Sequence, residues 1–178
     1  MQINTRTQSF EKYLLDVYRL KNVIRYNTRC KLKDESVAEH SFYVALFALK
    51  ICEEYKINEQ TTNLCLIKAI LHDMPEIDLN DITHDVKERL KLRPFLKQYE
   101  DEYFEKHFKY YANIMTKALP IVDTIVVLAD AWSVYQYSLN EIQLGNKSIE
   151  IEEIYDESKE RIKKLEEHLK KELKDEQD

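Results

Sequence analysis

The scarcity of residues that turn the chain sharply is the strongest constraint on its fold. A single glycine, Gly145, and three prolines occur among 178 residues. Tight hairpins between β-strands need glycine or a similar turn residue, so this chain has few places to reverse in that way. Leu, Lys, Glu and Ile are abundant, and such a composition favours long helices. The sequence therefore predicts an all-α chain whose helices are joined by short polar links.

The length and composition predict one globular domain. A chain of 178 residues can bury a continuous core, and its contents of 44% hydrophobic and 34% charged residues are typical of folded proteins. The sequence contains no internal repeat, low-complexity segment or linker that would mark a second domain. We expect a single domain over residues 1–178, with a core at about residues 10–145 and a C-terminal helix at about residues 149–174.

Charge and hydropathy limit the partners. The net charge of −6 disfavours a nucleic-acid polymer as partner, because such binding relies on many Lys and Arg residues. No segment approaches the roughly 18 apolar residues that a membrane span requires, and no apolar targeting segment opens the chain. The three cysteines form no Cys-x-x-Cys pair, which indicates reduced, buried thiols. We expect a cytoplasmic protein that does not bind membranes.

Apolar spacing and helix-end signals place the elements. Ser36 and Glu39 form the pattern of a capping box, so a helix should begin there and direct His40 inward on the face of Val44. Pro75 should end the next helix, which leaves His72 and Asp73 beside a loop. The predicted helices are residues 10–23, 36–55, 61–73, 93–117, 120–145 and 149–174, with a basic loop at 25–35 and a carboxylate-rich loop with one short helical turn at 76–86.

Asp130 is the most unusual of the polar residues, because it lies within the most apolar helix of the chain. Burial of an unpaired charge costs roughly several kcal/mol, so this carboxylate needs a cation or several hydrogen-bond donors. Taken alone, a partner such as an arginine or helix N-terminal amides is the commoner solution. His40 taken alone is likewise more often a hydrogen-bonded core histidine than a metal ligand.

The balance changes when these residues are considered together. His40, His72, Asp73 and Asp130 come from three separate helices and form a set of two nitrogen and two oxygen donors. Such a set suits a divalent Mn, Fe, Co, Ni or Zn ion. An ion with open positions lowers the pKa of a bound water and generates a nucleophile near neutral pH. The sequence favours a metal centre over a network of core hydrogen bonds.

Two further residues are placed to act at such a centre. Glu76 lies four residues after His72 and could serve as general acid or base, although a solvated loop carboxylate is the simpler alternative. Arg25 lies in the basic loop before the His40 helix and could bind a phosphate in bidentate fashion, although an ordinary basic surface cluster is equally compatible. The adjacent Tyr26 could stack on a base or sugar.

The order and spacing of these motifs resemble a known family. The pattern H…HD…D is that of the HD-domain metal phosphohydrolases, and the flanking residues resemble the YfbR-like 5′-deoxynucleotidases over residues 10–145. The motifs that carry this resemblance are Arg25-Tyr26, Ser36-Val37-Ala38-Glu39-His40-Ser41, His72-Asp73-Met74-Pro75-Glu76 followed by Asp81, and Ala129-Asp130-Ala131.

The resemblance implies a fold, a site and a partner. It implies an HD-domain helical bundle that forms a homodimer and holds one divalent metal, commonly Co or Mn, through His40, His72, Asp73 and Asp130. Glu76 and Arg25 would be catalytic, the first for proton transfer and the second for orienting the phosphate. The residues implied to contact the deoxynucleotide are Arg25, Tyr26, Asp81, Ile82, Thr83 and His84. The family usually has Trp at the position of Tyr26 and Pro-Thr at the position of Thr83-His84.

The function that the resemblance implies is removal of the 5′-phosphate from deoxynucleoside monophosphates. A deoxynucleoside triphosphate triphosphohydrolase is the alternative enzyme, because relatives with the same motif skeleton act on triphosphates. A non-catalytic nucleotide-binding HD module is a third possibility, but it would have no chemical need for Glu76 or Arg25. A purely structural helical protein, in which the inward His and Asp residues satisfy one another, is the fourth.

Overall fold

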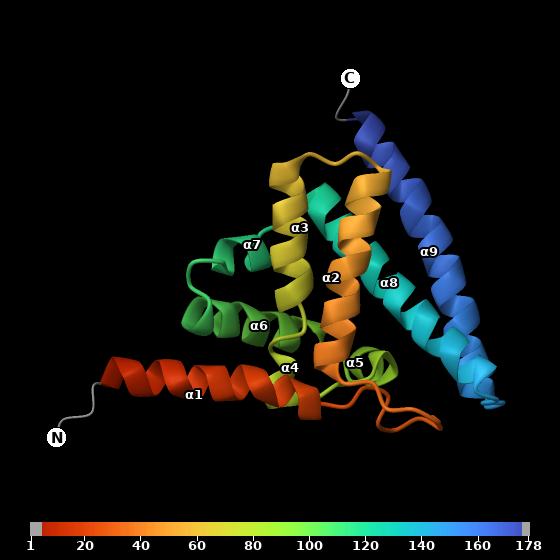
Figure 1. Cartoon of the computed structure of the whole chain (residues 1–178), viewed down its shortest axis with the longest axis horizontal. Coiled ribbons are helices and arrows are strands. Elements are labelled where there is room, and N and C mark those ends of the chain that lie inside the picture. The colour runs from red at the N-terminus through yellow and green to blue at the C-terminus, as the bar shows by residue number, and fades with distance from the viewer. Residues whose placement is uncertain (1–4, 176–178) are drawn as a thin grey trace.

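The computed structural model describes residues 5–175, with side chains described for residues 10–83 and 86–175. This part of the chain forms helices and no strand, apart from one isolated antiparallel bridge between Ile24 and Ser36 (Figure 1). The all-α prediction is confirmed. The elements are α1 (Thr5–Arg19), the 3₁₀ turn η1 (Leu20–Asn22), α2 (Val37–Glu54), α3 (Glu59–Leu71), α4 (Glu76–Leu79), α5 (His84–Arg89), α6 (Arg93–His107), α7 (Ala112–Thr116), α8 (Pro120–Gln143) and α9 (Ile149–Asp175).

Four of the long helices enclose the main core. Helices α2 and α3 run side by side, α8 crosses behind them, and α9 follows the outer side of α8 (Figure 1). Their facing sides bury small and branched residues such as Val44, Ala48, Cys65, Ile125 and Leu169. Helix α8, which carries Asp130, is therefore packed against helices on more than one side.

No described helix is both long and apolar enough to cross a bilayer.

The start of α2 is defined by the predicted capping box. Ser36 Oγ accepts a hydrogen bond from the Glu39 amide at 3.2 Å, and Glu39 Oε2 accepts from the Ser36 amide at 2.8 Å. These bonds satisfy amide groups that the first turn of a helix leaves without a partner. His40 follows in the same turn, and its side chain is fully buried beside Val44, as predicted.

The end of α3 is set by Pro75. His72 still has helical backbone angles and caps the helix, after which residues 72–75 form a turn. Proline cannot donate a backbone hydrogen bond and disfavours helix in the residue before it. The loop predicted over residues 76–86 contains two short helices rather than one turn. Between them Asn80 has a positive φ of 58°, which lets the chain change direction.

The prediction of one long helix over residues 93–117 is wrong. The structure divides this segment into α6 and α7, with a turn at residues 108–111. Phe108 leaves helical geometry and packs its ring against Tyr13, Tyr103 and Phe104, while Ala112 returns to the same apolar cluster with 1% of its surface exposed. An unbroken helix could not place both ends of the segment on that cluster, so tertiary packing overrides local propensity.

Two smaller expectations also need correction. Helix α1 begins at Thr5 and ends at Arg19, and residues 20–22 continue as a 3₁₀ turn, whereas the prediction was residues 10–23. Cys52 and Cys65 are buried as predicted, but Cys30 is exposed on the loop between η1 and α2. The predicted stop after α8 is confirmed, since Gly145 has a φ of 97°, a conformation that residues with a Cβ rarely adopt.

Candidate metal centre

The four predicted ligands come together from three helices. His40 lies in the first turn of α2, His72 and Asp73 lie at the end of α3, and Asp130 lies near the middle of α8. The side chain of His40 is 1% exposed, whereas those of His72, Asp73 and Asp130 are 18%, 22% and 24% exposed. The cluster is therefore closed on the side of α2 and open on the opposite side.

The spacing of the donor atoms fits a small divalent ion. His40 Nε2 lies 3.4 Å from His72 Nε2, 3.4 Å from Asp73 Oδ2 and 3.4 Å from Asp130 Oδ1, and His72 Nε2 lies 3.1 Å from Asp73 Oδ2. Ligands bonded at about 2.0–2.2 Å to one ion stand about 3.0–3.4 Å apart. Donor atoms of His40, His72 and Asp73 all fall within 4.8 Å of one another, and Asp130 lies outside this group of three. Asp130 Oδ1 faces His40, while Oδ2 faces Arg161. The donor chemistry of the four residues and the spacing of the inner three fit a transition metal.

The hydrogen bonds made by Nδ1 of each histidine determine whether Nε2, which faces the cluster, carries a proton. His72 Nδ1 lies 2.7 Å from the Ala69 carbonyl oxygen, to which it can only donate, so in the neutral ring the lone pair lies on Nε2, which faces the cluster. His40 Nδ1 contacts Arg25 Nη1 at 2.8 Å and Ser133 Oγ at 3.0 Å. Arg25 Nη1 can only donate, so in this arrangement Nδ1 accepts and the ring proton lies on Nε2. Ligation through His40 Nε2 requires that proton to move to Nδ1, with Ser133 Oγ as its acceptor and Arg25 Nη1 displaced.

The electrostatics of the cluster favour ionised carboxylates. Burial works against the charged form of His72, but the adjacent Asp73 carboxylate outweighs it and raises the His72 pKa to about 9. Burial likewise opposes ionisation of the two aspartates, yet His72 holds the pKa of Asp73 well below its usual range, and the hydrogen bond from His40 lowers the pKa of Asp130 to about 2. Both aspartates are thus in the form that binds cations.

Glu76, at the start of α4, has a carboxyl group of the opposite character. Burial and the neighbouring Asp73 and Asp81 carboxylates raise its pKa to about 9. Its Oε2 is buried without a hydrogen-bond partner, and Lys87 Nζ stands 3.9 Å from Oε1. The carboxyl therefore carries a proton at neutral pH. Two neighbouring carboxyl groups with separated pKa values are a common arrangement for acid–base chemistry.

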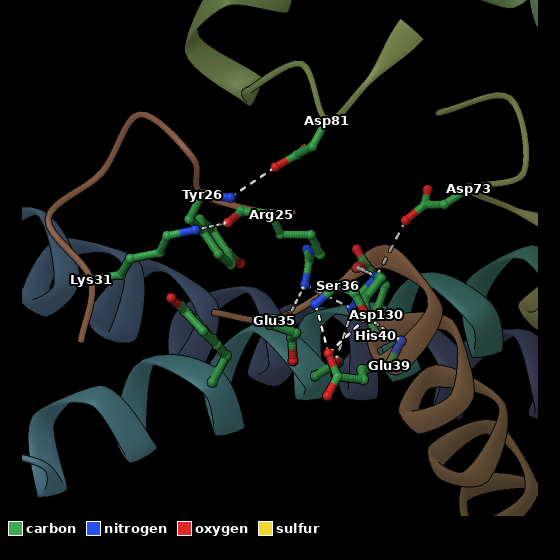
Figure 2. A network of polar contacts seen from close by, with 12 residues as sticks. Arg25, Tyr26, Lys31, Glu35, Ser36, Glu39, His40, Asp73, Asp81 and Asp130 are labelled. Atoms are coloured by element: carbon green, nitrogen blue, oxygen red, sulfur yellow. Dashed lines mark hydrogen bonds and ion pairs between the residues drawn. The ribbon is translucent and has the colours of Figure 1, made fainter. Parts of the chain in front are cut away.

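The loop between η1 and α2 brings Arg25 and Tyr26 to the cluster, as Figure 2 shows. The Arg25 guanidinium is buried and donates to Glu35 Oε2 at 2.7 Å. Tyr26 adopts a φ of 54°, which is rare for a residue with a bulky side chain. Its amide donates to Asp81 Oδ2 at 2.9 Å, and its ring stacks on Tyr137 with centroids 4.5 Å apart. These contacts hold a strained backbone in place beside the cluster.

A cavity of about 740 Å³ opens in front of the cluster. Its volume lies within the range of about 300–1,000 Å³ that is usual for small-molecule sites. The predicted residues that line it are Arg25, Tyr26, His72, Asp73, Glu76, Asp81, Ile82, Thr83 and Asp130. His40 lies behind this lining as the innermost member. The side chain of the remaining predicted residue, His84, lies outside the described residues.

The structure also adds residues that the sequence did not single out. Helix α9 forms one wall of the cavity through Glu150, Glu153, Ile154, Glu157, Ser158 and Arg161. Arg161 Nη1 contacts Asp130 Oδ2 at 3.3 Å. The apolar stripe of α9 includes Ile154 and Ile162, and Arg161 lies at its edge, which is the one signal that could have indicated a position facing α8.

Glu141 is another residue that sequence reasoning missed. It is fully buried near the end of α8, and its carboxylate accepts hydrogen bonds from the Leu32 amide at 2.7 Å, the Lys33 amide at 2.9 Å and Asn146 Nδ2 at 2.8 Å. A buried carboxylate is stable when several donors face it. Glu141 therefore anchors the loop that carries Arg25 and Tyr26.

Comparison with known proteins decides the family. A family model described as 5′-deoxynucleotidase YfbR-like matches residues 12–174, which is nearly the whole chain. The chain belongs to the YfbR-like 5′-deoxynucleotidase family. The resemblance carried by its motifs is confirmed, and the match includes α9, which those motifs did not cover. No curated protein matches the chain.

Several solved structures share the fold of this chain. A protein of Pyrococcus horikoshii OT3 is 27% identical, with a TM-score of 0.74 over 92% of this chain and 94% of that one. The HD phosphohydrolase DatZ of cyanophage S-2L, bound to dA and one catalytic Zn²⁺, is 14% identical, with a TM-score of 0.72 over 90% of this chain and 96% of that one. An HD-domain phosphohydrolase of Listeria innocua is 24% identical, with a TM-score of 0.66 over 93% of this chain and 88% of that one.

These neighbours confirm the predicted HD-domain helical fold. Family membership, together with a cluster of donors that fits a divalent ion, makes the chain a metal-dependent phosphohydrolase.

Proposed function

We propose that this protein is a 5′-deoxynucleotidase, which converts a deoxynucleoside monophosphate and water into a deoxynucleoside and phosphate. The observation that carries the proposal is the cluster of His40, His72, Asp73 and Asp130 at the base of a cavity of about 740 Å³. The cavity also contains a protonated carboxyl group and a guanidinium, which this reaction can use. Membership of the YfbR-like family supports the same assignment.

His40, His72, Asp73 and Asp130 would hold one divalent transition metal, with Co or Mn favoured and Ni, Fe and Zn as alternatives. Such an ion supplies Lewis acidity, which activates a water and stabilises negative charge on phosphoryl oxygens. The Zn²⁺ of DatZ, reported as catalytic in that protein, supports this use of the fold. His72 keeps the correct nitrogen toward the ion because Ala69 accepts its other proton.

Glu76 would supply the proton that the leaving group needs. As water adds to phosphorus and the bond from phosphorus to O5′ breaks, O5′ takes a proton to become the sugar hydroxyl. The Glu76 pKa of about 9 leaves a proton on its carboxyl group at neutral pH. After that transfer, the Glu76 carboxylate can accept a proton from the attacking water, which returns the carboxyl to its starting form.

The sugar and phosphate would contact the loops at the cavity mouth. Arg25 would stabilise charge on the phosphate, and Tyr26 would border the sugar from its fixed, stacked position. Asp81 Oδ2 already accepts from the Tyr26 amide, so Oδ1 would accept from a sugar hydroxyl. Ile82 and Thr83 line the cavity beside it, and His84 would complete this group.

The charges along the α9 wall of the cavity support a monophosphate over a triphosphate. Three carboxylates, Glu150, Glu153 and Glu157, line that wall beside one cation, Arg161. A triphosphate carries about two more negative charges than a monophosphate, so it would meet stronger repulsion there. The dA bound in DatZ supports a deoxynucleoside-sized ligand in this fold.

We also propose that the chain forms a homodimer through its exposed apolar face. Helix α1 exposes Phe10, Leu14, Leu15 and Tyr18, and α2 exposes Phe42, Tyr43, Leu46 and Leu49. Lys21 joins the two groups, since it lies over the Tyr18 ring and lines a shallow hollow with Phe42 and Tyr43. A patch of this kind on a monomer marks an interaction site. Light scattering after gel filtration should give the mass of a dimer, and Tyr43→Glu should give that of a monomer.

The test of the proposed reaction is phosphate release from a panel of deoxynucleotides and ribonucleotides in the presence of Mn²⁺ or Co²⁺. We expect orthophosphate from deoxynucleoside monophosphates and no release in chelator. Release of inorganic triphosphate from deoxynucleoside triphosphates would favour the triphosphohydrolase instead. Tight nucleotide binding with no product would favour a non-catalytic module.

A further inference from the structure

The arginine that the sequence singled out is already engaged. Arg25 is only 9% exposed, and one terminal nitrogen, Nη1, contacts both Glu35 Oε2 at 2.7 Å and His40 Nδ1 at 2.8 Å (Figure 2). A charge-assisted bond of 2.7 Å in a buried setting is strong. Arg25 therefore acts as a fixed positive charge beside His40, and a phosphate would have to compete with Glu35 for its guanidinium.

Arg161 lies on the opposite side of the cluster, and it is more exposed and less tightly hydrogen-bonded than Arg25. Its side chain is 48% exposed, it lines the cavity, and among the described residues its one recorded polar contact is to Asp130 Oδ2 at 3.3 Å. That distance is long for a charge-assisted hydrogen bond, which is usually about 2.7–2.9 Å. The guanidinium has five N–H donors in a planar fork, and this single contact leaves most of the fork for another anion.

The position of Arg161 relative to the cluster follows from the Asp130 carboxylate. One oxygen, Oδ1, faces His40 Nε2 at 3.4 Å, and the other, Oδ2, faces Arg161 Nη1 at 3.3 Å. The Asp130 carboxylate thus lies between the Arg161 guanidinium and His40. A phosphate with one oxygen at the cluster would bring a second oxygen within reach of Arg161, because the long, half-exposed side chain can adjust its position.

We propose that Arg161, from α9, is a phosphate-binding residue of this site, which releases Asp130 and grips the substrate phosphate when it arrives. This inference rests on the proposed function, because it assigns a contact to the phosphate group of that substrate. Arg25 and Arg161 then have different roles. Arg25 supplies a buried charge beside His40, and Arg161 supplies the guanidinium that exchanges a protein carboxylate for the substrate.

The experiment compares inorganic phosphate binding to Mn²⁺-loaded wild type, Arg161→Gln and Arg161→Lys by isothermal titration calorimetry. A hydrogen-bonded ion pair to phosphate predicts that Arg161→Gln raises the Kd for phosphate about 10- to 100-fold. Arg161→Lys keeps the charge but loses the fork, so it should raise the Kd by a smaller factor. The matched control is Lys163→Gln, which removes the same charge from an exposed position on α9 and should change the Kd by less than about twofold.

Two further measurements separate phosphate binding from other roles. The product deoxynucleoside lacks the phosphate, so its Kd should be unchanged in Arg161→Gln. The affinity for Mn²⁺, measured without phosphate, tests whether Arg161 serves only to position Asp130. A loss of Mn²⁺ affinity with unchanged phosphate affinity at saturating Mn²⁺ would overturn the proposal, and so would equal losses in Arg161→Gln and Lys163→Gln.

The binding experiment does not depend on turnover, so it is separable from the proposed reaction. A wild type that binds phosphate through Arg161 but releases none from any nucleotide would refute the 5′-deoxynucleotidase assignment and leave the phosphate site standing. A wild type that hydrolyses monophosphates while Arg161→Gln binds phosphate normally would keep the enzyme and refute the role of Arg161. A Mn²⁺-loaded wild type without affinity for phosphate would refute the phosphate site.

Discussion

The floor and the rim of the cavity are built on different principles. We define the floor as His40, His72, Asp73 and Asp130, which are carried by the long helices α2, α3 and α8 of the main core. We define the rim as the loop of residues 23–36, the segment of α4 and α5, and the cavity-facing side of α9. Packed helices hold the floor, whereas hydrogen bonds to carboxylates hold the loops of the rim, as the half-buried Asp81 and the buried Glu141 illustrate.

This difference suits the two proposed roles of the cavity, metal binding at the floor and substrate binding at the rim. Metal ligands must keep their spacing to within a few tenths of an ångström, which close-packed helices provide. Substrate contacts must suit one ligand, and loops and helix faces can change without disturbing the core. Two of the described residues with positive φ lie on the rim, Tyr26 at 54° and Asn80 at 58°, and none lies in the floor. Damage to the floor should therefore remove chemistry, and damage to the rim should alter substrate binding or stability.

The largest effect is expected from loss of a floor ligand. Asp73→Ala should abolish metal binding and reduce phosphate release to the level of chelator-treated protein, a fall of at least about 10⁴-fold. Atomic absorption of the purified variant would measure bound metal, and a phosphate assay would measure turnover. Asp78→Ala is the matched control, because Asp78 is an exposed carboxylate five residues away. Equal losses in both variants would show that general charge, and not ligation, is responsible.

Glu76→Gln should separate chemistry from stability. The variant cannot transfer a proton, so turnover should fall by about 10²- to 10⁴-fold while bound metal stays unchanged. It should also stabilise the metal-free protein at pH 7 by about 1–3 kcal/mol, because the folded protein keeps Glu76 protonated, whereas the unfolded chain ionises it. Urea denaturation at pH 7 would measure this gain. A destabilised variant would contradict the assigned protonation.

Glu141→Ala tests the rim without touching the floor. Removal of this carboxylate leaves the Leu32 and Lys33 amides without their acceptor, so unfolding free energy should fall by about 2–4 kcal/mol in urea denaturation. The affinity for Mn²⁺ should change by less than about threefold, since α2, α3 and α8 still hold the ligands. Glu160→Ala, an exposed position on α9, serves as control. If metal binding were lost together with the loop, the distinction between floor and rim would fail.

The smallest effect concerns pH. His72 is protonated in the metal-free protein up to a pKa of about 9, so Mn²⁺ must displace a proton and its affinity should rise about tenfold per pH unit from pH 7 to 9. The raised pKa also stabilises the metal-free fold below pH 6.5, and this contribution is lost as the pH rises through about 9. Melting temperatures with and without Mn²⁺ should therefore diverge as the pH increases. Curves that stay parallel would show that His72 releases no proton.

The comparison of floor and rim also explains what could be predicted from the sequence. The floor could be found because its signals are local: the capping box fixes the first turn of α2, Pro75 ends α3, and Asp130 stands out as a charge in an apolar helix. The rim contacts depend on distant parts of the chain. Glu141 and Arg161 lie among mixed polar and apolar neighbours in sequence, and their partners lie 109 and 31 residues away. Spacing along one helix indicates at most which face is buried, and it does not identify the distant partner.

The division of residues 93–117 into α6 and α7 has the same origin. Tyr103, Phe104 and Phe108 have the spacing of one helix, and no glycine or proline marks the turn. The turn forms because Phe108 and Ala112 both pack on the apolar cluster beside α1. Contacts of this kind are decided by the assembled fold and not by the local sequence.

The most direct test of the account is phosphate release from deoxyadenosine monophosphate by chelator-treated protein, before and after Mn²⁺ or Co²⁺ is restored. The account predicts no release from the treated protein and full recovery with either ion in wild type. It predicts no recovery in Asp73→Ala at any metal concentration. Undiminished release from protein whose metal content is shown to be zero would contradict a metal-dependent phosphohydrolase.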